Sequence, residues 1–320
     1  MKPMIKYRGG KTKEIPQIMP FVPRFSGRYI EPFFGGGALF FHLEPRTAII
    51  NDINEKLMNF YIGVRDNFAV VKKELDELEF IYRQNRNDFV KLKRLSPDKM
   101  VEDKNEKLYY SLRAQFNGLE NKTYSDATLY YFINKTAYSG MIRYNANNEF
   151  NVPFGRYPNF NSSYVNKSHS ILLNNAEVFN NDFESIFKMC DKDDFVFLDP
   201  PYDCVFSDYG NQEYKYGFGE NEHKRLAEAF FSLPCKALMV IAKTPLTERL
   251  YEKNITFEYG KNYAVNIRNR FKSQATHIIV TNYSKEYVEM SRIEMAADFY
   301  RVPEIAQVMI CEENEKYGEN

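Results

Sequence analysis

Five short apolar segments constrain the fold of this chain more than any other feature. Each ends close to a Gly, Asp, Asn or Pro, and they lie at residues 28–31, 48–51, 195–198, 236–242 and 277–281. Short apolar runs that end at turn residues are typical of buried strands, and crossover helices fit between most of them. The pattern therefore predicts an α/β domain.

A helical pattern interrupts these strand-like segments. From residue 56 to residue 136, apolar side chains recur at helical spacing among many charges, which predicts a small helical bundle. The residues that carry this spacing are Leu75, Leu78, Phe80, Ile81, Phe89, Leu92 and Leu95. Residues 141–154, MIRYNANNEFNVPF, place two strand-like pieces around the Asn-rich turn 145–148, which predicts a β-hairpin.

The composition limits the class of protein. A chain of 320 residues that is 44% hydrophobic can bury one large core or two moderate ones. Its longest uncharged apolar runs fall far short of the roughly 20 residues of a membrane helix, and the N-terminus has no apolar signal core. We therefore expect a soluble, unexported protein. The four cysteines form no CxxC pair, so neither a zinc site nor a disulfide framework is expected.

Charge is unevenly distributed although the formal net charge is zero. Residues 83–113 carry nine Lys or Arg against five Asp or Glu, whereas residues 286–320 carry nine acidic residues against three basic ones. A basic region of this kind fits a nucleic-acid partner, and it equally fits a solvated helix face.

A glycine-rich motif follows the first predicted strand. Residues 31–37, EPFFGGG, precede the helix-like ALFFHL, and glycines there allow a sharp turn close to a ligand. A dinucleotide fingerprint would need Gly where Phe40 stands. Asp52 ends the second strand, where an acidic residue can bind a ribose diol. The pair predicts a cofactor with a ribose and no pyrophosphate; the alternative is a tight turn with a helix cap.

A second glycine pair lies near the N-terminus, in the sequence RGGKT at residues 8–12. A phosphate-binding loop is excluded because its pattern requires Gly where Ile5 stands. We expect Lys11 to meet a carboxylate instead, such as that of a methionine moiety.

The strongest local motif is Asp199-Pro200-Pro201-Tyr202, directly after the apolar strand 195–198. Ligand sites of open α/β sheets lie beyond the carboxyl ends of strands. The prolines rigidify the turn and remove backbone donors, so the Asp199 carboxylate and the Pro200 carbonyl remain as two neighbouring acceptors. Such a pair suits the amino group of adenine, whose delocalised lone pair is freed when both hydrogens are held. Tyr202 can stack on the base, which must be flipped out of a duplex. The alternative is a simple strand terminator.

Taken in order, the segments IKYRGGK, EPFFGGGALFF, NDIN, RYNANNEFNVPFGRY and FLDPPY resemble the Dam-like family of adenine-specific DNA methyltransferases, of the D12 class and alpha group. The resemblance covers about residues 4–285. It implies a Rossmann-like, S-adenosylmethionine-dependent methyltransferase domain at 1–56 and 165–285, a helical target-recognition domain with a β-hairpin at 57–164, and an acidic extension at 286–320. It implies methylation of a flipped adenine in double-stranded DNA, at a GA-containing, GATC-like site, in the cytoplasm of a bacterium or a phage-infected bacterium, with no metal and no membrane partner.

The resemblance also assigns roles to individual residues. The catalytic tetrad is Asp199, Pro200, Pro201 and Tyr202. The expected cofactor-binding residues are Tyr7, Lys11, Glu31, Phe33, Gly35, Asp52, Ile53, Asp182, Phe183 and Asp199. The expected DNA-binding residues are Tyr138, which inserts beside the flipped base, Ser139, Met141, the guanine-reading Arg143, Asn145, and Pro153, which lies near a thymine methyl. Lysines of the helical region, such as Lys91 and Lys93, are expected to meet phosphates.

The chain departs from the family pattern at four positions. Tyr7 replaces a tryptophan, Arg8 a small residue, Ser139 an asparagine and Asn148 a glycine, so the packing of the cofactor and the target sequence are open. Three alternatives remain: an RNA adenine methyltransferase, a catalytically inactive DNA-binding protein, and a nucleotide hydrolase, which the broken phosphate loop opposes. The oligomeric state is open, and a monomer fits the sequence.

Overall fold

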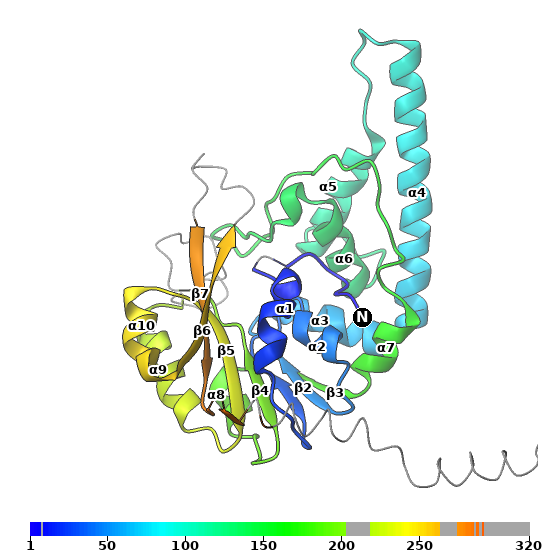
Figure 1. The fold of residues 1–320 in the computed structure, drawn as a ribbon. Coiled ribbons are helices and arrows are strands. Elements are labelled where there is room, and N and C mark those ends of the chain that lie inside the picture. Colours follow the sequence, from blue (N-terminus) through cyan, green and yellow to red (C-terminus); the bar gives the residue numbers. More distant parts are fainter. Residues whose placement is uncertain (8, 203–217, 263–273, 285, 288–289, 291–320) are drawn as a thin grey trace, which may run out of the picture.

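A seven-stranded sheet forms the centre of the molecule (Figure 1), in the order β3-β2-β1-β4-β5-β7-β6. The computed structural model describes residues 1–7, 9–202, 218–262, 274–284, 286–287 and 290. The strands are β1 (Tyr29–Glu31), β2 (Ala48–Asn51), β3 (Ala176–Phe179), β4 (Phe195–Leu198), β5 (Lys236–Ala242), β6 (Ile255–Asn262) and β7 (Gln274–Thr281). The sheet confirms the predicted α/β class.

Helices pack around this sheet and form a separate bundle beside it. The α-helices are α1 (Ile15–Ile18), α2 (Ala38–Leu43), α3 (Glu55–Asp66), α4 (Phe68–Leu95), α5 (Lys104–Phe116), α6 (Asp126–Thr136), α7 (Lys167–Leu173), α8 (Phe183–Phe187), α9 (Glu220–Phe231) and α10 (Pro245–Tyr251). The 3₁₀ turns are η1 (Lys11–Lys13), η2 (Met19–Phe21), η3 (Tyr138–Gly140) and η4 (Glu252–Asn254). No helix of the described ranges has the length and apolar character needed to cross a bilayer.

The strand order reverses between β1 and β4. From β1 the chain moves outward to β2 and β3, whereas β4 returns to the other side of β1 and is followed by β5. These five strands are parallel, and β7 runs antiparallel between β5 and β6. Ligands of such sheets bind outside the carboxyl ends of the strands at the point of reversal. The topology thus predicts a ligand-binding crevice at the ends of β1, β2 and β4.

Each face of the sheet has its own apolar core, because alternate residues of a strand point to opposite faces. In β4, Phe195 and Phe197 join a core with α2, α3 and the helical bundle. Val196 and Leu198 of the same strand join a second core with α8, α9 and α10. Burial on both faces explains why the central parallel strands are continuous apolar runs.

The predicted helical bundle is present as α3 to α6, but α4, its longest helix, extends beyond the buried core of the bundle. Leu75 and Leu78 of α4 are buried, as predicted from their spacing. Phe80, Leu92 and Leu95 are instead 50%, 49% and 71% exposed. The predicted helical spacing is therefore present, but these three side chains lie outside the core.

The predicted hairpin is a pair of isolated antiparallel bridges rather than two extended strands. Tyr144 pairs with Phe150 around the Asn-rich turn, and Ala137 pairs with Phe154. The Asn117 side chain, just after α5, accepts a bond from the Phe150 N–H (2.8 Å) and donates one to its carbonyl (3.0 Å). The Asn117 amide thus makes the two backbone hydrogen bonds that a neighbouring strand would make, and it attaches the hairpin to the helical bundle.

Candidate active site

Three loop segments meet at the carboxyl edge of the sheet, where the strand order reverses. The glycine motif leaves β1 after Glu31, Asp52 follows β2, and Asp199 follows β4. The three strands are neighbours in the sheet, and all are parallel. Parallel strands end at the same edge, so residues far apart in the sequence come together there.

The glycine loop is held by hydrogen bonds to Asp52, which follows β2, and to Tyr61 of α3. One carboxylate oxygen of Asp52 accepts a bond from the Gly35 N–H at 2.8 Å, and the other accepts one from the Asn54 N–H at 3.0 Å. The Tyr61 hydroxyl donates to the Gly35 carbonyl at 2.9 Å. Gly35 has a φ of 47°, and a Cβ there would lie 2.7 Å from the Tyr7 ring. Only glycine fits this conformation and this contact.

Lys11 joins the N-terminal segment to the turn formed by residues 199–202. Its side chain is 1% exposed, and its ammonium donates hydrogen bonds to the Asp199 carboxylate, to the Tyr202 hydroxyl at 2.5 Å and to the Gly9 carbonyl at 3.1 Å. The sequence predicted a carboxylate partner for Lys11, and in this structure that partner is Asp199. Contact between Lys11 and a cofactor carboxylate stays a prediction.

Burial and like charge set the electrostatics of the crevice. Glu31 is 2% exposed, and burial is the main reason why its pKa lies well above the ordinary value. The nearby Asp199 and Asp52 raise that pKa further, whereas Lys11 lowers it. Burial also raises the pKa of Asp52 to about 6. A raised pKa favours the neutral form of Glu31, so the negative charge beside the Lys11 ammonium comes from Asp199 and Asp52.

Asp182 begins α8 and is held by an arginine from α9. Its two oxygens accept bonds from Arg225 at 2.8 Å each, and the guanidinium lies 4.3 Å from the centre of the Phe183 ring. Phe183 packs against Phe33 of the glycine motif, with ring centres 5.5 Å apart. The predicted residues Phe33, Asp182 and Phe183 thus come together beside the crevice. Arg225, which fixes two of them, was not predicted.

The predicted DNA-binding residues form a separate group on the hairpin. Tyr138 is 45% exposed, and Ser139 beside it adopts a positive φ of 56°. Arg143 is exposed, and its Nε donates to the Asn151 side chain at 2.8 Å. Asn145 uses its side-chain oxygen for the turn, because that oxygen accepts bonds from the N–H groups of residues 147 and 149. Its amide therefore shapes the turn that presents Arg143.

The remaining predicted residues lie at the edges of these two groups. Ile53 is half-buried beside Asp52, and Met141 is half-buried in the hairpin segment. Pro153 is exposed, and its carbonyl accepts a bond from the Tyr138 N–H at 2.9 Å. This bond ties the two arms of the hairpin together at its base.

A buried hydrogen-bonded cluster behind Tyr202 was not predicted. The Glu14 carboxylate accepts a bond from the Tyr259 hydroxyl at 2.7 Å and lies 2.7 Å from Nδ1 of the fully buried His277. The His277 ring meets the Tyr202 ring edge to face at 5.2 Å. The residues come from the junction of η1 and α1, from β6 and from β7, and they form no local motif, so the sequence alone gave no signal for the cluster.

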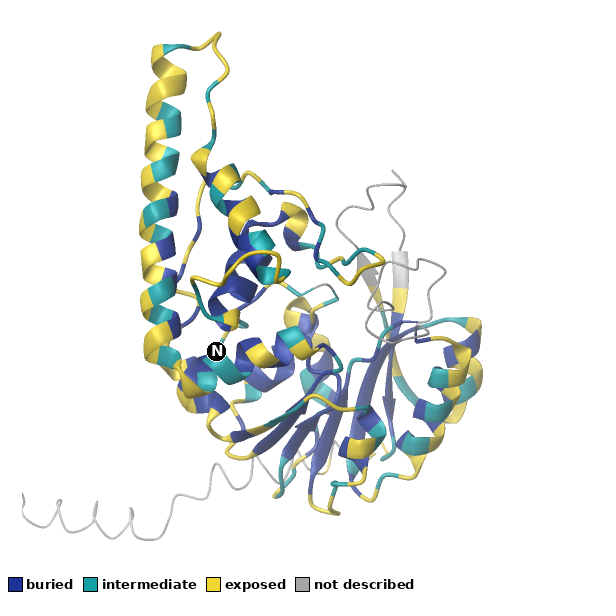
Figure 2. Cartoon of the chain, turned by 180° about the vertical axis from the view of Figure 1, so that it is seen from behind, coloured by how far each residue is buried: buried dark blue, intermediate teal, exposed yellow. Residues whose placement is uncertain are grey.

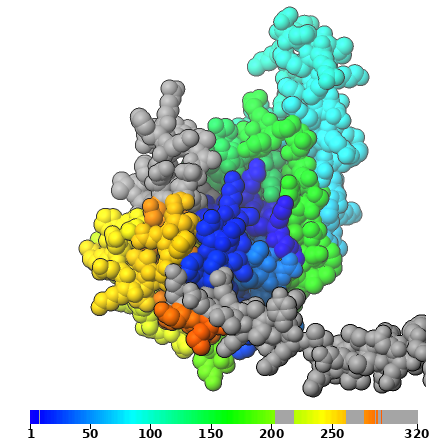
Figure 3. Space-filling model, viewed as in Figure 1, coloured from blue at the N-terminus to red at the C-terminus, as the bar shows by residue number. Residues whose placement is uncertain are grey.

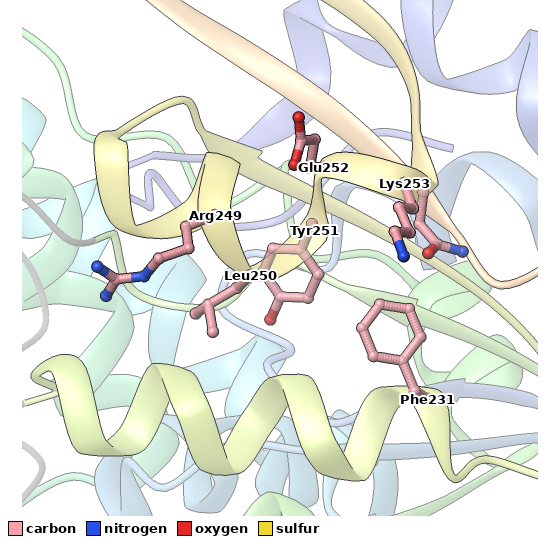
Figure 4. A pocket seen from close by; sticks show the side chains of 7 residues that line it. Phe231, Arg249, Leu250, Tyr251, Glu252 and Lys253 are labelled. Carbon is pink, nitrogen blue, oxygen red and sulfur yellow. The ribbon is translucent and has the colours of Figure 1, made fainter.

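Two other features lie away from this crevice. A cavity of about 280 Å³ between α9 and α10 (Figure 4) is lined by Phe231, Arg249, Leu250, Tyr251, Glu252, Lys253 and Asn254, and none of the predicted site residues contributes to it. In the part of the chain that the structure describes, no cluster of three or more His, Cys, Asp or Glu side chains could hold a metal ion.

Comparison with known proteins places these residues in a family context. Residues 7–265 match the family model of the D12 class N6 adenine-specific DNA methyltransferase. The chain is 34% identical over 291 residues to the type II methyltransferase M.CviBI of Paramecium bursaria Chlorella virus NC1A, covering 88% of this chain and all of that protein. It is 31% identical over 301 residues to the type II methyltransferase M1.LlaDCHI of Lactococcus lactis subsp. cremoris, covering 88% and 96%. It is 29% identical over 238 residues to the DNA adenine methylase of Haemophilus influenzae, covering 71% and 73%.

Proposed function

The chain belongs to the D12 class of N6 adenine-specific DNA methyltransferases, and from that premise we propose that it moves a methyl group from S-adenosylmethionine to an adenine flipped out of duplex DNA. Residues 1–56 and 165–285 form the catalytic domain of this proposal. Residues 57–164 form the domain that recognises the target. The acidic segment 286–320 falls almost wholly outside the described residues and has no part in it.

One observation carries the proposal: the Asp199 carboxylate and the Pro200 carbonyl follow β4 at the point where the strand order reverses. The two acceptors suit the two hydrogens of an exocyclic amino group. An amino group held in this way gains tetrahedral character, so its lone pair becomes available for attack. A preorganised acceptor of this kind is worth about 10²-fold to 10³-fold in rate.

The residues around the crevice fit S-adenosylmethionine. Each Asp52 oxygen accepts one backbone N–H, which leaves further lone pairs for the ribose hydroxyls. Phe33 and Phe183 offer apolar rings for the adenine ring, with Asp182 at its edge. The carboxylates of Asp52 and Asp199 suit the positive sulfonium, which supplies the methyl group. The Asp52 acceptor, the two aromatic rings and the negative charge together support S-adenosylmethionine over a nicotinamide dinucleotide as the cofactor.

Asp199 and its neighbours perform the remaining steps of the proposed mechanism. Lys11 fixes the carboxylate of Asp199, and Tyr202 lies beside it to stack on the flipped base. As the nitrogen–carbon bond forms and the sulfur–carbon bond breaks, the nitrogen acquires a positive charge. The hydrogen bond to Asp199 stabilises that charge and is the route by which the surplus proton leaves.

The target sequence is proposed from the hairpin. Arginine can bond O6 and N7 of guanine together, a pattern that no other base presents in the major groove. Arg143 is exposed on the hairpin and is oriented by Asn151. We therefore propose that Arg143 reads a guanine, which the resemblance to the family places directly 5′ of the target adenine in a GATC-like site.

Methylation of unmodified genomic DNA by the purified protein tests the proposal. Mapping N6-methyladenine by single-molecule sequencing should reveal one short motif that contains GA. Parallel incubations with duplex DNA, single-stranded DNA and RNA of the same sequence separate the proposal from its nearest alternative. Methyl uptake by RNA in preference to duplex DNA, or no uptake from S-adenosylmethionine, would refute it.

A further inference from the structure

The longest helix of the protein extends beyond the part of the molecule that stabilises it. The last buried residue of α4 is Tyr82, and no residue from 83 to 95 is buried. At 1.5 Å per residue, this free portion is roughly 20 Å long. Figures 1 and 2 show it standing clear of α5 and α6, with side chains that are mostly exposed. We call residues 83–103, which include the loop that returns to α5, the arm.

The arm is an ordered element that is fastened at both ends. At its tip, the Lys93 ammonium donates to the carbonyls of Pro97 (2.8 Å) and Lys99 (2.9 Å), which closes the turn after α4. At its base, the Asn105 amide donates to the Tyr82 carbonyl at 2.9 Å. These bonds hold the arm in one direction. They also show that Lys93, which the sequence suggested as a phosphate contact, is engaged within the protein.

One side of the arm carries a stripe of positive charge. Between residues 83 and 95 the helix has five basic residues and one acidic residue, Asp88, which pairs with Lys104 at 3.2 Å. Arg83, Lys91 and Arg94 are exposed, and a helical turn of 3.6 residues places them within about 80° of one another. No carboxylate of the described chain lies within ion-pair distance of these three side chains. Within the described part of the chain, these three positive charges therefore have no carboxylate partner.

Charge complementarity decides which partner such a stripe fits. Duplex DNA carries one negative charge per roughly 1.7 Å of its axis, so the arm can follow about six base pairs of backbone. The protein as a whole has no net charge, so the stripe is a local concentration rather than a general basicity. Contacts to phosphates position a protein without reading its sequence, and they need only exposed cations on a rigid support.

We propose that Arg83, Lys91 and Arg94 bind phosphates of the duplex outside the recognition sequence, so that the arm lengthens the DNA footprint on one side of the target. This inference rests on the proposed function, because it takes duplex DNA as the substrate. The hairpin reads the site, and the arm adds affinity that is independent of sequence.

Two duplexes of different length test the arm directly. Both carry the same mapped site at the centre; one is about 12 base pairs long and the other about 30, so only the longer one reaches past the free portion of the arm. The triple variant Arg83→Ala, Lys91→Ala, Arg94→Ala should bind the long duplex about tenfold or more weakly and the short duplex as the wild type does. On the long duplex, the slope of the logarithm of the binding constant against the logarithm of the salt concentration should become shallower by up to about 2.7. Each lost phosphate contact accounts for about 0.9 of that change. The turnover number at saturating DNA should not change.

A matched control removes three positive charges elsewhere. Arg46, Lys192 and Lys253 are exposed; the first two precede β2 and β4, and Lys253 lies in η4 directly before β6, at the edge of the sheet opposite the crevice. Their triple alanine variant should bind both duplexes as the wild type does. Thermal melting of both triple variants checks that the fold is retained.

Three results would overturn the inference. Unchanged affinity and salt slope of the arm variant on the long duplex would show that the arm does not bind DNA. An equal loss on both duplexes would show that it acts at the recognition site instead. A wild-type protein that methylates no duplex at all would refute the proposed function and the arm's partner with it, and this outcome is recognised before any variant is made.

Discussion

Cofactor affinity should depend on pH through Asp52. Burial raises the pKa of this carboxyl group to about 6, and the N–H groups of Gly35 and Asn54 offset only part of that effect. Ribose hydroxyls bind best to the ionised carboxylate, so the cofactor favours the deprotonated form. Binding then releases a proton at low pH, and affinity must fall as the pH drops through the pKa.

The magnitude follows from the ionised fraction. With a pKa of about 6, roughly one tenth of the free protein has an ionised Asp52 at pH 5, so the dissociation constant should rise about tenfold, or about 1.4 kcal/mol. Asp52→Asn removes the charge at every pH, and losing a hydrogen bond to a charged group costs about 1.5 to 3 kcal/mol. The variant should therefore bind S-adenosylmethionine about 10-fold to 150-fold more weakly at pH 7.5, with little change between pH 5 and 7.

Isothermal titration calorimetry from pH 5 to pH 8 measures both effects. Repeating the titration at pH 5.5 in buffers of different ionisation enthalpy counts the released protons. Glu177→Gln, an exposed carboxyl change on the neighbouring strand β3, is the matched control and should follow the wild type. Wild-type affinity that stays constant down to pH 5 would refute the reasoning. If cofactor affinity still falls at low pH in Asp52→Asn, the titrating group is not Asp52. The Glu31→Gln variant would then test whether that group is Glu31.

Further predictions concern the catalytic turn and the hairpin. Asp199→Ala should lower methyl transfer about 10²-fold to 10³-fold with calorimetric cofactor binding retained, and near-normal turnover would exclude a catalytic role. Arg143→Ala should cost about 1 to 3 kcal/mol on the preferred site and relax the guanine requirement in an oligonucleotide set varied at each position. Arg156→Ala removes another exposed arginine of the same segment and should keep that requirement. Asn117→Ala releases the Phe150 backbone, so methylation rates should discriminate less between cognate and near-cognate duplexes at unchanged cofactor affinity.

The sequence predicted the central strands and missed those at the margins. β1, β2, β4, β5 and β7 lie where short apolar runs were found, because strands buried on both faces have few polar residues. β3 and β6 form the two edges of the sheet. An edge strand has less to bury; in β3 only Ala176 is buried and Glu177 is exposed. Its composition therefore resembles that of a loop.

The motifs of the site were predictable because each is local, whereas the contacts between them were not. Asp52 and Asp199 each follow a recognisable strand, and the rule for parallel sheets brings the two to one edge. The bond from Lys11 to Asp199 spans 188 residues, and that from His277 to Glu14 spans 263. No local pattern encodes such pairs. Helical spacing likewise could not show where the core beneath α4 ends: Leu92 keeps the spacing but is 49% exposed.

The N-terminal segment connects all parts of the site. The Asn134 side chain on α6 accepts a bond from the Lys6 N–H at 3.0 Å and donates one to its carbonyl at 2.7 Å, four residues before Tyr138. Five residues further along the chain, Lys11 holds Asp199, and Glu14 then holds the cluster behind Tyr202. Figure 3 shows the N-terminal part of the chain, in blue, between the helical insertion in green and elements of the C-terminal half in yellow. Under the proposed function, this segment links α6, which leads into the hairpin, to Asp199, the proposed acceptor for the target amino group.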